Sequence, residues 1–315
     1  MKPIYIIGTG AIGKTLAVAL RLQNRNVMLL RGSVQQAEPV TQRIQVAYKE
    51  EQLLEADIDI KTLQSVDQLD GIVVLTNKSY GNQQLSETLK SKIGNSPVVL
   101  LQNGLGVERA FIERGYTQVY RCVLFVTCQQ TGDHSVKYKP VAVSPIGIEK
   151  GDDAQLTEIV QHLNSNYFEF KVEKEIQSVI WKKAIANSVF NSICPLLETD
   201  NGIFHRNDAV MAMASRIIAE CLEIAHAKGI QLTQQEVESS ILQISKFSDG
   251  QLISTLQDIR AGRETEIETL NFEIARIAEE LGKAALVKET KLLGELTLQK
   301  SKLSTTQPRR SVVSA

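Results

Sequence analysis

The sequence lacks the features that mark several large classes of protein. Its 315 residues carry 35 basic and 36 acidic side chains, and this net charge of −1 does not favour binding to nucleic acid or to an anionic membrane. No apolar run approaches the length of about eighteen residues that a transmembrane helix needs. The first apolar segment begins at Ile4, which leaves no room for a cleavable leader. We therefore expect a soluble, cytoplasmic protein with no nucleic-acid or membrane partner.

Cysteine is scarce, and its spacing matches no known site. Four cysteines are present, without a Cys-x-x-Cys pair and without metal-like spacing to the four histidines. We expect reduced thiols and no metal site. The composition, 43% hydrophobic and 23% charged, is ordinary for a globular protein and provides a sizeable core for one large domain or two smaller ones.

The strongest motif is a glycine-rich turn between a predicted strand at 4–7 and a predicted helix at 14–22. Its residues are Gly8, Thr9, Gly10, Ala11, Ile12 and Gly13, in the pattern G-x-G-x-x-G. In such a turn the first glycine permits the sharp bend, the second lets backbone approach a pyrophosphate, and the third lets helix and strand pack closely. A strand at 26–31 completes a β-α-β unit and argues against a glycine turn without a ligand. We predict that these six residues bind a dinucleotide.

The end of the second predicted strand indicates which dinucleotide binds. An acidic residue there would hold the ribose 2′-hydroxyl of NAD, whereas this chain has Arg31-Gly32-Ser33. A cation and a hydroxyl suit a 2′-phosphate, so we predict NADPH or NADP as the cofactor. The alternative role for Arg31 is that of a solvated surface charge.

Further apolar runs predict a parallel sheet. The segments 71–76 and 97–101 are continuous apolar runs, typical of strands covered on both faces. The second run ends in a polar, glycine-flanked turn at 102–106, on the carboxyl edge of the sheet where α/β proteins bind ligands. Short strands are expected at 44–48 and 58–60, and several between 119 and 172 predict a mixed extension of the sheet.

From about residue 175, apolar residues recur at spacings of three and four, which predicts helices. The clearest span 208–228, with Gly229 just beyond its end, and 264–281, with an apolar stripe along one face. A last helix is expected at about 283–300.

These patterns predict an α/β protein of two domains. An N-terminal, Rossmann-type dinucleotide-binding domain at 1–173 precedes an all-helical domain at 174–303, and the polar end of the chain at 304–315 is expected to be mobile.

A predicted helix at 181–192 carries a polar stripe. Lys183, Asn187 and Asn191 lie at i, i+4 and i+8 among apolar residues, and so share one face. Buried amide and ammonium groups need partners. These are either loop carbonyls of the protein itself or a ligand, and a second polar segment at 254–268 favours the ligand.

Four ordered motifs resemble those of the ketopantoate reductase (2-dehydropantoate 2-reductase) family over nearly the whole chain. The motifs are the glycine-rich turn, Asn103-Gly104-x-Gly106, Trp181-x-Lys183-x-x-x-Asn187-x-x-x-Asn191, and Leu256-Gln257-Asp258 followed by Arg263-x-Thr265-Glu266-Ile267. The resemblance implies reduction of 2-dehydropantoate to (R)-pantoate by NADPH, in pantothenate and coenzyme A biosynthesis. It also implies a helical domain like the C-terminal domain of 6-phosphogluconate dehydrogenase, with the keto group reduced between the two domains.

The resemblance assigns roles to single residues. The family's catalytic lysine corresponds to Lys183, whose ammonium could stabilise charge on the keto oxygen and donate a proton as general acid. Its substrate contacts correspond to Asn103, Asn187, Asn191, Asn201, Ser254 and Glu266. Its cofactor contacts outside the glycine-rich turn correspond to Arg31, Lys78, Asn103 and Glu266.

Two other functions stay open. The chain departs from the family pattern at Ala184 and Thr255, which would fit a paralogous NADP(H)-dependent reductase of another 2-keto or hydroxy acid. A non-catalytic NADP(H)-binding sensor is the other alternative, and the presence of both Lys183 and Glu266 argues against it. The expected partner is a small 2-keto acid, and the amphipathic helices fit either a monomer or a homodimer.

Overall fold

The computed structural model describes residues 2–32, 37–49 and 52–306, with side chains to residue 304, and divides the chain into two compact units. Unit 1 comprises Met1–Asn103 and Val107–Ile176, and unit 2 comprises Gly104–Gly106 and Gln177–Ala315. The division at Ile176 lies just beyond the expected boundary at residue 173. The inclusion of Gly104–Gly106 in unit 2 was not expected from the sequence.

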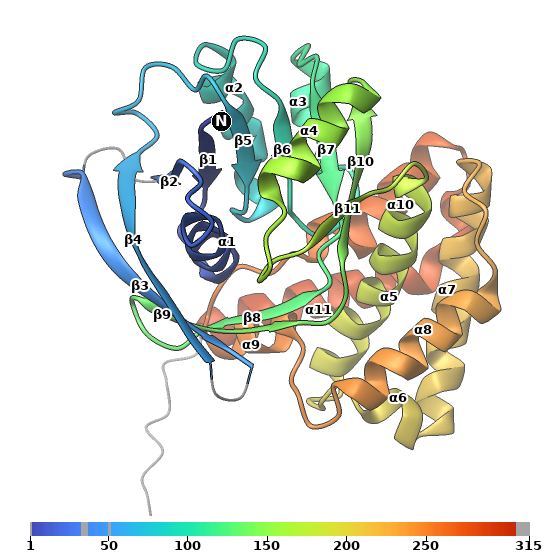
Figure 1. Ribbon diagram of the computed structural model, residues 1–315. Coiled ribbons are helices and arrows are strands. Elements are labelled where there is room, and N and C mark those ends of the chain that lie inside the picture. Colours follow the sequence, from blue (N-terminus) through green and yellow to red (C-terminus); the bar gives the residue numbers. More distant parts are fainter. Residues whose placement is uncertain (1, 33–36, 50–51, 307–315) are drawn as a thin grey trace, which may run out of the picture. The chain divides into compact units, whose positions relative to one another are not determined.

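Unit 1 is built on an eleven-stranded sheet with a parallel centre (Figure 1). The parallel strands follow the order β4-β2-β1-β5-β6-β7. Numbered among themselves along the chain they read 3-2-1-4-5-6, the order of dinucleotide-binding folds. Their bounds, in that spatial order, are Gln52–Thr62, Val27–Arg31, Ile4–Ile7, Ile72–Leu75, Val98–Leu100 and Val119–Cys122. The predicted Rossmann-type fold is therefore confirmed.

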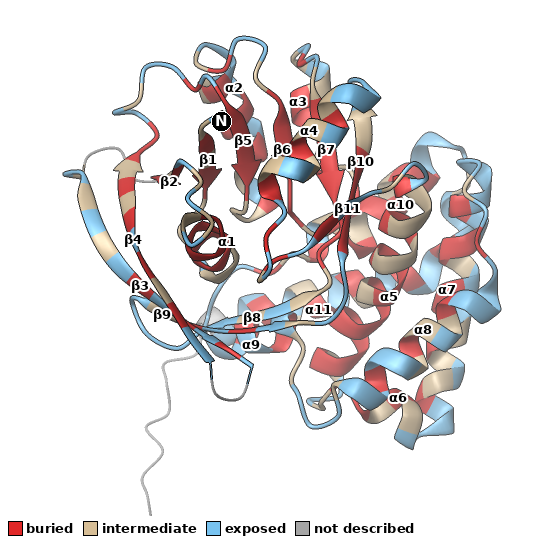
Figure 2. Cartoon of the chain, viewed as in Figure 1, coloured by how far each residue is buried: buried red, intermediate tan, exposed pale blue. Residues whose placement is uncertain are grey.

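The central strands are buried on both faces, as their apolar runs predict. Every residue of β5 and β6 is buried, and β1 is buried except at Tyr5 (Figure 2). Because β1 and β5 are neighbours whose connections leave in opposite directions, their carboxyl ends form the switch point at which such sheets bind ligands.

Antiparallel pairs extend the sheet on both sides, as expected. On one side β10 (Ser144–Lys150) pairs with β7, and β11 (Phe170–Val172) adds in parallel to β10. On the other side β3 (Val40–Tyr48) pairs with β4, followed by β9 (Ser135–Pro140) and β8 (Val126–Gln130).

The expected short strands at 44–48 and 58–60 are parts of the much longer β3–β4 hairpin. Both strands bury alternate residues, and the outward positions carry charged groups. Arg43 on β3 forms ion pairs with Glu55 and Asp57 on β4. These charges interrupt the apolar pattern on which the shorter expectation rested, while cross-strand pairing makes them compatible with a strand.

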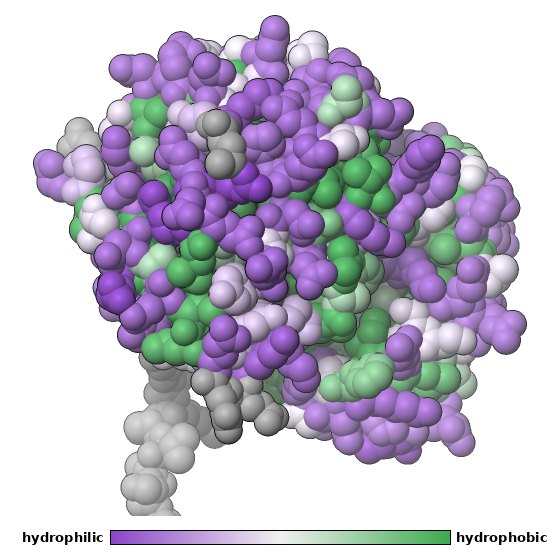
Figure 3. All heavy atoms as spheres, in the orientation of Figure 1, coloured by the Kyte–Doolittle hydropathy of each residue, from purple (hydrophilic) through white to green (hydrophobic). Residues whose placement is uncertain are grey.

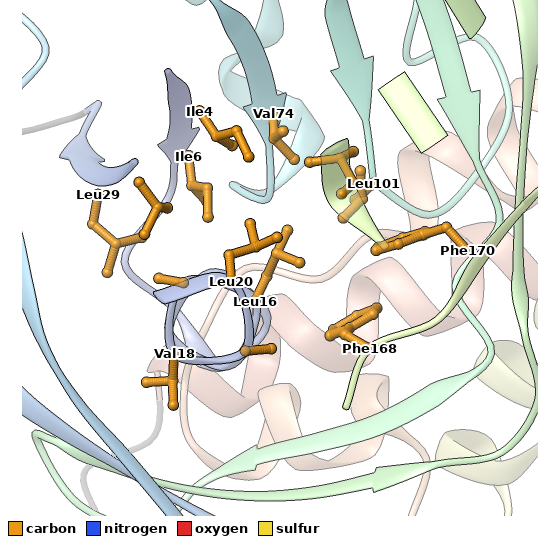
Figure 4. Packing of buried hydrophobic residues seen from close by; sticks show 14 of the residues in the cluster. Ile4, Ile6, Leu16, Val18, Leu20, Leu29, Val74, Leu101, Phe168 and Phe170 are labelled. Atoms are coloured by element: carbon orange, nitrogen blue, oxygen red, sulfur yellow. The ribbon is translucent and has the colours of Figure 1, made fainter. Parts of the chain in front are cut away.

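Helix α1 (Ala11–Arg21) is enclosed by the sheet. It contacts β1, β2, β4, β3, β9 and β8, and every residue from Gly13 to Leu20 is buried. Figure 4 shows Leu16 and Leu20 directed towards the side of Ile6 and Val74, with Val18 on the opposite side of the helix. The remaining helices of unit 1 are η1 (Ser79–Gly81), α2 (Asn82–Lys90), α3 (Arg109–Glu113) and α4 (Asp153–Leu163).

The described part of unit 2 contains helices and no strand, which confirms the all-helical prediction. The α-helices are α5 (Ile176–Leu196), α6 (Ile203–Arg206), α7 (Asp208–Ala227), α8 (Gln234–Phe247), α9 (Ser254–Arg260), α10 (Asn271–Glu280) and α11 (Lys288–Thr306). The 3₁₀ turns are η2 (Ile267–Thr269) and η3 (Ala284–Leu286). As expected, α7 ends just before Gly229, whose φ of +80° suits a residue without a side chain.

The predicted continuous helix at 264–281 is wrong. The helix begins only at α10, because Leu270 has φ −116° and ψ −101°, and η2 precedes it as a separate turn. The carbonyl of Thr269 accepts a 2.8 Å hydrogen bond from the backbone N–H of Leu105. Gly104 fits there because a side chain would collide with Thr269. The 104–106 loop thus occupies the carbonyl of Thr269, which in a continuous helix would accept a hydrogen bond from the next turn.

The last helix extends beyond its expected end. α11 continues to Thr306, so residues 304–306 of the expected mobile tail are helical, and residues 307–315 lie outside the described range. None of the helices among the described residues combines the length and apolar character needed to cross a bilayer. The face drawn in Figure 3 is largely hydrophilic, with apolar side chains in small separate groups.

Gly294 offers a test of the packing in unit 2. A Cβ at this position in α11 would lie 2.9 Å from the Cβ of Asn271. Glycine normally destabilises a helix relative to alanine by about 1 kcal/mol, but here we expect Gly294→Ala to lower the free energy of unfolding by about 1–3 kcal/mol through overpacking. Urea unfolding followed by circular dichroism measures the change.

Gly81→Ala is the control, because nothing lies within 4 Å of the added Cβ and φ is negative there. We expect it to change stability little or to raise it. Equal effects of the two substitutions would contradict close packing of α11 on α10.

Candidate functional site

The glycine-rich turn of unit 1 leaves a helix end open for a ligand. Gly8 has φ +119°, and a Cβ there would lie 2.6 Å from the backbone nitrogen of Asn77. Gly13 is buried, and its Cβ would collide with the carbonyl oxygen of Gly8. Nothing lies within 4 Å of a Cβ on Gly10, which is exposed. The two outer glycines therefore permit tight packing, and the middle one adjoins open space.

The remaining residues of the turn prepare the start of α1. Thr9, Ala11 and Ile12 are half-buried, and the latter two pack against the core of unit 1. No side chain caps the helix, and its first turn holds no acidic residue. The first N–H groups of a helix lack partners within it and carry partial positive charge. This end of α1 is therefore suited to an anion such as a pyrophosphate.

Lys14 and Thr15 give the glycine-rich turn a second sequence pattern. Gly8-x-x-x-x-Gly13-Lys14-Thr15 also matches a phosphate-binding P-loop, in which the lysine reaches the phosphates. Here Lys14 is only 6% exposed, and its ammonium donates to the carbonyl of Asp133 in the β8–β9 turn. Burial lowers the pKa of Lys14, while the charge of Asp133 opposes that shift. Its ammonium therefore serves the packing of α1 in this structure.

The cysteines of the described chain are free, as expected. Cys128 lies next to Lys14, with its Sγ 3.1 Å from the hydroxyl of Thr15, and burial raises its pKa to about 11. It is therefore a neutral thiol at physiological pH, unsuited to act as a nucleophile. Within the described residues no group of cysteine, histidine and carboxylate side chains could hold a metal ion.

Arg31 ends β2 and is half-buried, with exposed Gly32 after it. Ser33, the hydroxyl expected beside it, lies outside the described residues. Among the ion pairs of the described chain, none involves Arg31. Its guanidinium thus gives up no salt bridge to another described residue on binding a phosphate.

Polar residues follow β5, the strand next to β1. The hydroxyl of Thr76 donates to the carbonyl of Gly8 at 3.0 Å, which ties this end of β5 to the glycine-rich turn. Asn77 and Lys78 come next, both half-buried. The predicted cofactor contact Lys78 therefore lies on a loop that is joined directly to the dinucleotide turn.

A buried amide pair fixes that loop and was missed in the sequence. Gln102, just after β6, donates to the side-chain oxygen of Asn82 at 2.8 Å, and Asn82 donates back to Gln102 at 2.7 Å. Gln102 also donates to the carbonyl of Asn77 at 2.9 Å, and Asn82 to that of Val107 at 2.8 Å. The pair joins the loops after β5 and β6, and so positions Lys78 and the half-buried Asn103. Gln102 adjoins Asn103 in the sequence and Asn82 follows Lys78 by four residues, but only the fold shows that the two amides meet.

In unit 2, helix α5 presents Lys183 and Asn187 as half-buried residues, whereas Asn191 is buried. The amide of Asn191 bonds within the protein. It donates to the carbonyl of Asn187 at 3.0 Å and accepts from the hydroxyl of Thr255 at 2.7 Å. Its oxygen also lies 3.5 Å from the Ser254 hydroxyl. Asn191 thus holds α9 against α5. In this structure its partners are groups of the protein itself, which is one of the two alternatives that the sequence left open.

The expected polar segment at 254–268 contains a buried carboxylate and polar groups that are less buried. Ser254 is exposed at the first position of α9, and Glu266 is half-buried just before η2. The buried Asp258 instead accepts a 2.8 Å hydrogen bond from Arg263, which closes the turn after α9. Ser254 and Glu266 therefore remain as the candidates for a ligand from this segment.

Asn201, in the turn before α6, is buried and held by its backbone. Its N–H donates to the carbonyl of Gln251 at 2.9 Å, and its carbonyl accepts from the buried Ser245 hydroxyl at 2.7 Å. The side-chain oxygen of Asn201 is buried and accepts no hydrogen bond from the described chain. It is therefore a buried acceptor without a donor among the described residues, which costs folding free energy.

The Asn82–Gln102 pair predicts a specific effect on stability. Asn82→Leu should lower the free energy of unfolding by about 1–3 kcal/mol, because Gln102 loses its partner in a buried site. The double variant Asn82→Leu/Gln102→Leu should lose less than the sum of the two single effects. Urea unfolding of the four proteins in this cycle measures the coupling.

Gln84→Leu, at an exposed position of the same helix, is the matched control and should stay within about 0.5 kcal/mol of the parent protein. Strict additivity of the two buried substitutions would show that the amides are not coupled.

Family models match the chain in both units. Residues 4–146 match the model described as ketopantoate reductase PanE/ApbA, and residues 175–292 match its C-terminal counterpart. Proteins named 2-dehydropantoate 2-reductase are similar along most of the chain. The one from Pyrococcus horikoshii is 28% identical, with 87% of this chain and 90% of that protein covered, and the one from Pyrococcus abyssi is 26% identical with the same coverage.

Solved structures share the fold. D-mandelate dehydrogenase with NADH and anilino(oxo)acetate matches with a TM-score of 0.83 at 23% identity, covering 96% of this chain and 100% of that one. The dimeric ketopantoate reductase of Staphylococcus aureus matches with a TM-score of 0.79 at 20% identity, covering 96% and 99%. Together with the family models, these similarities show that the chain belongs to the ketopantoate reductase family of NAD(P)-dependent oxidoreductases.

Proposed function

We propose that this protein reduces 2-dehydropantoate to (R)-pantoate with NADPH. The observation that carries the proposal is the match of both parts of the chain to ketopantoate reductase models, which include the positions of Lys183 and Glu266. The geometry agrees with it, because unit 1 offers an anion-binding helix end and unit 2 offers the half-buried Lys183 and Asn187 one turn apart on α5.

The residues of unit 1 fit NADPH. The uncapped start of α1 and the open space at Gly10 suit the pyrophosphate. Arg31 ends β2, where dinucleotide folds meet the adenosine ribose, so its guanidinium would pair with the 2′-phosphate. Lys78 and Asn103 follow β5 and β6 at the carboxyl edge, where they would bind parts of the cofactor nearer the nicotinamide. Glu266 of unit 2 is the further cofactor contact that the family resemblance implies.

The residues of unit 2 would hold the 2-keto acid. Bound NADPH supplies a hydride for the keto carbon. As that carbon is reduced, negative charge develops on its oxygen, and the ammonium of Lys183 would stabilise this charge and donate the proton. The carboxylate of Glu266 would accept a hydrogen bond from the hydroxyl end of the substrate. Asn187, Asn201 and Ser254 would orient its polar groups, while Asn191 holds the start of α9 that presents Ser254.

The departures from the family pattern do not change groups that face a ligand. Thr255 is buried, and its hydroxyl bonds Asn191 as a serine hydroxyl could. Ala184 is also buried. Both residues therefore act in packing within unit 2, and this favours 2-dehydropantoate over a different keto acid.

A substrate panel tests the assignment. NADPH oxidation is measured with 2-dehydropantoate, pyruvate, 2-ketoisovalerate and phenylglyoxylate, the last because D-mandelate dehydrogenase shares this fold. We expect kcat/KM to be highest for 2-dehydropantoate. An equal or higher value for another keto acid would overturn the substrate and leave the reductase class intact, and turnover of none would favour a sensor.

Lys183 is tested by its own substitution. We expect Lys183→Ala to lower kcat by about 10²-fold or more, because proton donation and charge stabilisation are both lost. The Kd for NADPH, measured by fluorescence titration, should change little. Lys182→Ala is the matched control, since Lys182 is the adjacent half-buried lysine of α5. Wild-type turnover of Lys183→Ala would remove Lys183 as the acid.

Arg31 is tested through cofactor preference. Arg31→Ala should weaken NADPH binding by about 10-fold or more, the scale of a lost hydrogen bond between charged groups, while NADH binding stays nearly constant. Arg43→Ala on β3 is the control, because Arg43 pairs with Glu55 and Asp57 on the strand surface. An equal loss for both cofactors would return Arg31 to the role of a surface charge.

A further inference from the structure

A cluster of polar groups joins two loops of unit 2 around one carboxylate. Asp200 lies in the turn between α5 and α6, and Asp249 and Gly250 lie in the loop between α8 and α9. The Oδ1 atom of Asp200 accepts hydrogen bonds from the backbone N–H groups of Gly202 at 2.7 Å and of Gly250 at 3.2 Å. Arg206, the last residue of α6, donates through Nη2 to both oxygens of Asp200, at 2.9 and 2.8 Å. We name these five residues the Asp200 cluster.

Arg206 joins the two loops through its acidic partners. Its Nη2 binds Asp200 from one loop, and its Nη1 forms an ion pair with Asp249 from the other. Gly202 leaves room for this contact, because a Cβ there would collide with the Asp249 carboxylate. The hydrogen bond from Arg206 lowers the pKa of Asp200, as do those from Gly202 and Gly250, against the opposing effect of burial. Asp200 is therefore an anion at physiological pH and holds its donors by charge-assisted hydrogen bonds.

The backbone of Asn201 joins the same two loops a second time. Asn201 stands between Asp200 and Gly202 in the sequence, and its N–H donates to the carbonyl of Gln251 at 2.9 Å. Its carbonyl accepts from the hydroxyl of Ser245, near the end of α8, at 2.7 Å. The position of Asn201 is therefore set by α8 and by the loop that follows it.

The loop between α8 and α9 contains no buried residue. All of the positions 248–254 are exposed or half-buried, and Ser254 at the end of this loop is the exposed first residue of α9. A segment with few buried contacts opens easily. Gly250 lies four residues before Ser254, so its hydrogen bond to Asp200 restricts the path of the chain into α9. The Asp200 cluster therefore holds a loop that core packing does not.

We propose that Asp200 is a positioning residue for the 2-keto acid substrate. By binding Arg206 and the N–H of Gly250, its carboxylate sets the positions of Asn201 and Ser254, and it takes no part in the proton transfer. The inference rests on the proposed function, in which Asn201 and Ser254 contact the substrate. A surface ion pair alone contributes little to stability. A carboxylate that holds two loops through their backbone instead removes freedom from the residues that the loops carry.

Steady-state kinetics of NADPH oxidation test the inference. We expect Asp200→Asn to raise KM for 2-dehydropantoate by about fivefold or more, because binding must then order a loop that the carboxylate no longer holds. We expect a much smaller change in kcat, since the bound substrate still meets the same groups. The Kd for NADPH should also change little. An unchanged KM would overturn the inference.

Two arginines of unit 2 provide a matched pair of variants. Arg206→Gln removes the ion pair with Asp200 and should raise KM as Asp200→Asn does, whereas Arg206→Lys keeps the charge and should restore part of the loss. Arg216→Gln removes an exposed arginine that binds Glu289 through Nε at 3.0 and 3.2 Å, and it should leave KM unchanged. Circular dichroism spectra and melting temperatures establish that each variant is folded. An equal rise in KM for the two glutamine variants would overturn the inference.

Hydrogen–deuterium exchange measures the loop directly. Peptides that cover residues 248–254 should exchange faster in Asp200→Asn and Arg206→Gln than in the wild type or in Arg216→Gln. Unchanged exchange in Asp200→Asn would show that the carboxylate does not hold the loop. Faster exchange with an unchanged KM would show a structural role alone, and would also overturn the inference.

Substitution of the two contacts separates this inference from the proposed function. Asn201→Ala/Ser254→Ala should raise KM by itself, and Asp200→Asn should then add little, because its effect passes through these residues. A wild-type KM for Asn201→Ala/Ser254→Ala would contradict the proposed substrate contacts and the inference with them. A raised KM to which Asp200→Asn adds its full effect would contradict the positioning role alone and leave the substrate contacts intact.

Discussion

The rest of unit 1 depends on one constraint, which is that the backbone packs too closely between β1 and α1 for any side chain to fit at Gly8 or Gly13. Gly13 packs on the carbonyl of Gly8, and Gly8 packs on the backbone of Asn77, so no Cβ fits at either glycine. The Thr76 hydroxyl adds a hydrogen bond to the Gly8 carbonyl. These contacts hold the start of α1 beside the ends of β1 and β5, and the open backbone at Gly10 follows from them. A cofactor site of this kind is built from backbone approach as much as from side chains.

The enclosure of α1 changes the meaning of residues that follow the glycines. Lys14 and Thr15 complete a P-loop pattern, yet the β8–β9 hairpin covers α1 and takes the Lys14 ammonium through the carbonyl of Asp133. The same hairpin places Cys128 against Thr15. Engaged in this way, the Lys14 ammonium links α1 to the β8–β9 hairpin. The same sequence pattern binds phosphate in P-loop folds. The sequence pattern alone cannot distinguish the two, because the hairpin lies far along the chain.

Buried amides recur as the devices that position site residues. Asn82 and Gln102 join the loops after β5 and β6, and Asn191 joins α5 to the start of α9. An amide both donates and accepts, so one side chain can satisfy two loops in a site where an unpaired group is costly. Such residues lie next to groups with chemical roles, as Asn191 lies one turn from Asn187 and Gln102 lies beside Asn103. The sequence pointed to Asn191 through the polar stripe of α5, but it assigned no role to Gln102, and only the fold shows what each amide joins.

The sequence by itself determined the elements whose signals are local. The apolar runs of β1, β2, β5 and β6, the glycine-rich turn and the Gly229 end of α7 all appear where expected, because strand burial, turn conformation and helix termination depend on adjacent residues. The placement of Arg31 at the end of β2, and of Lys183 and Asn187 on one face of α5, likewise depends on position along a single element.

Tertiary structure decided whatever depends on a distant partner. The expected helix at 264–281 is broken because Leu105, far away in the chain, takes the carbonyl of Thr269. The β3–β4 hairpin is longer than its apolar pattern because antiparallel backbone pairing continues from Val40 opposite Ile60 to Tyr48 opposite Gln52, past the charged positions. Asn191 is a brace because Thr255 reaches it. Each outcome depends on pairing between separate elements of the chain, and local periodicity carries no record of such pairs.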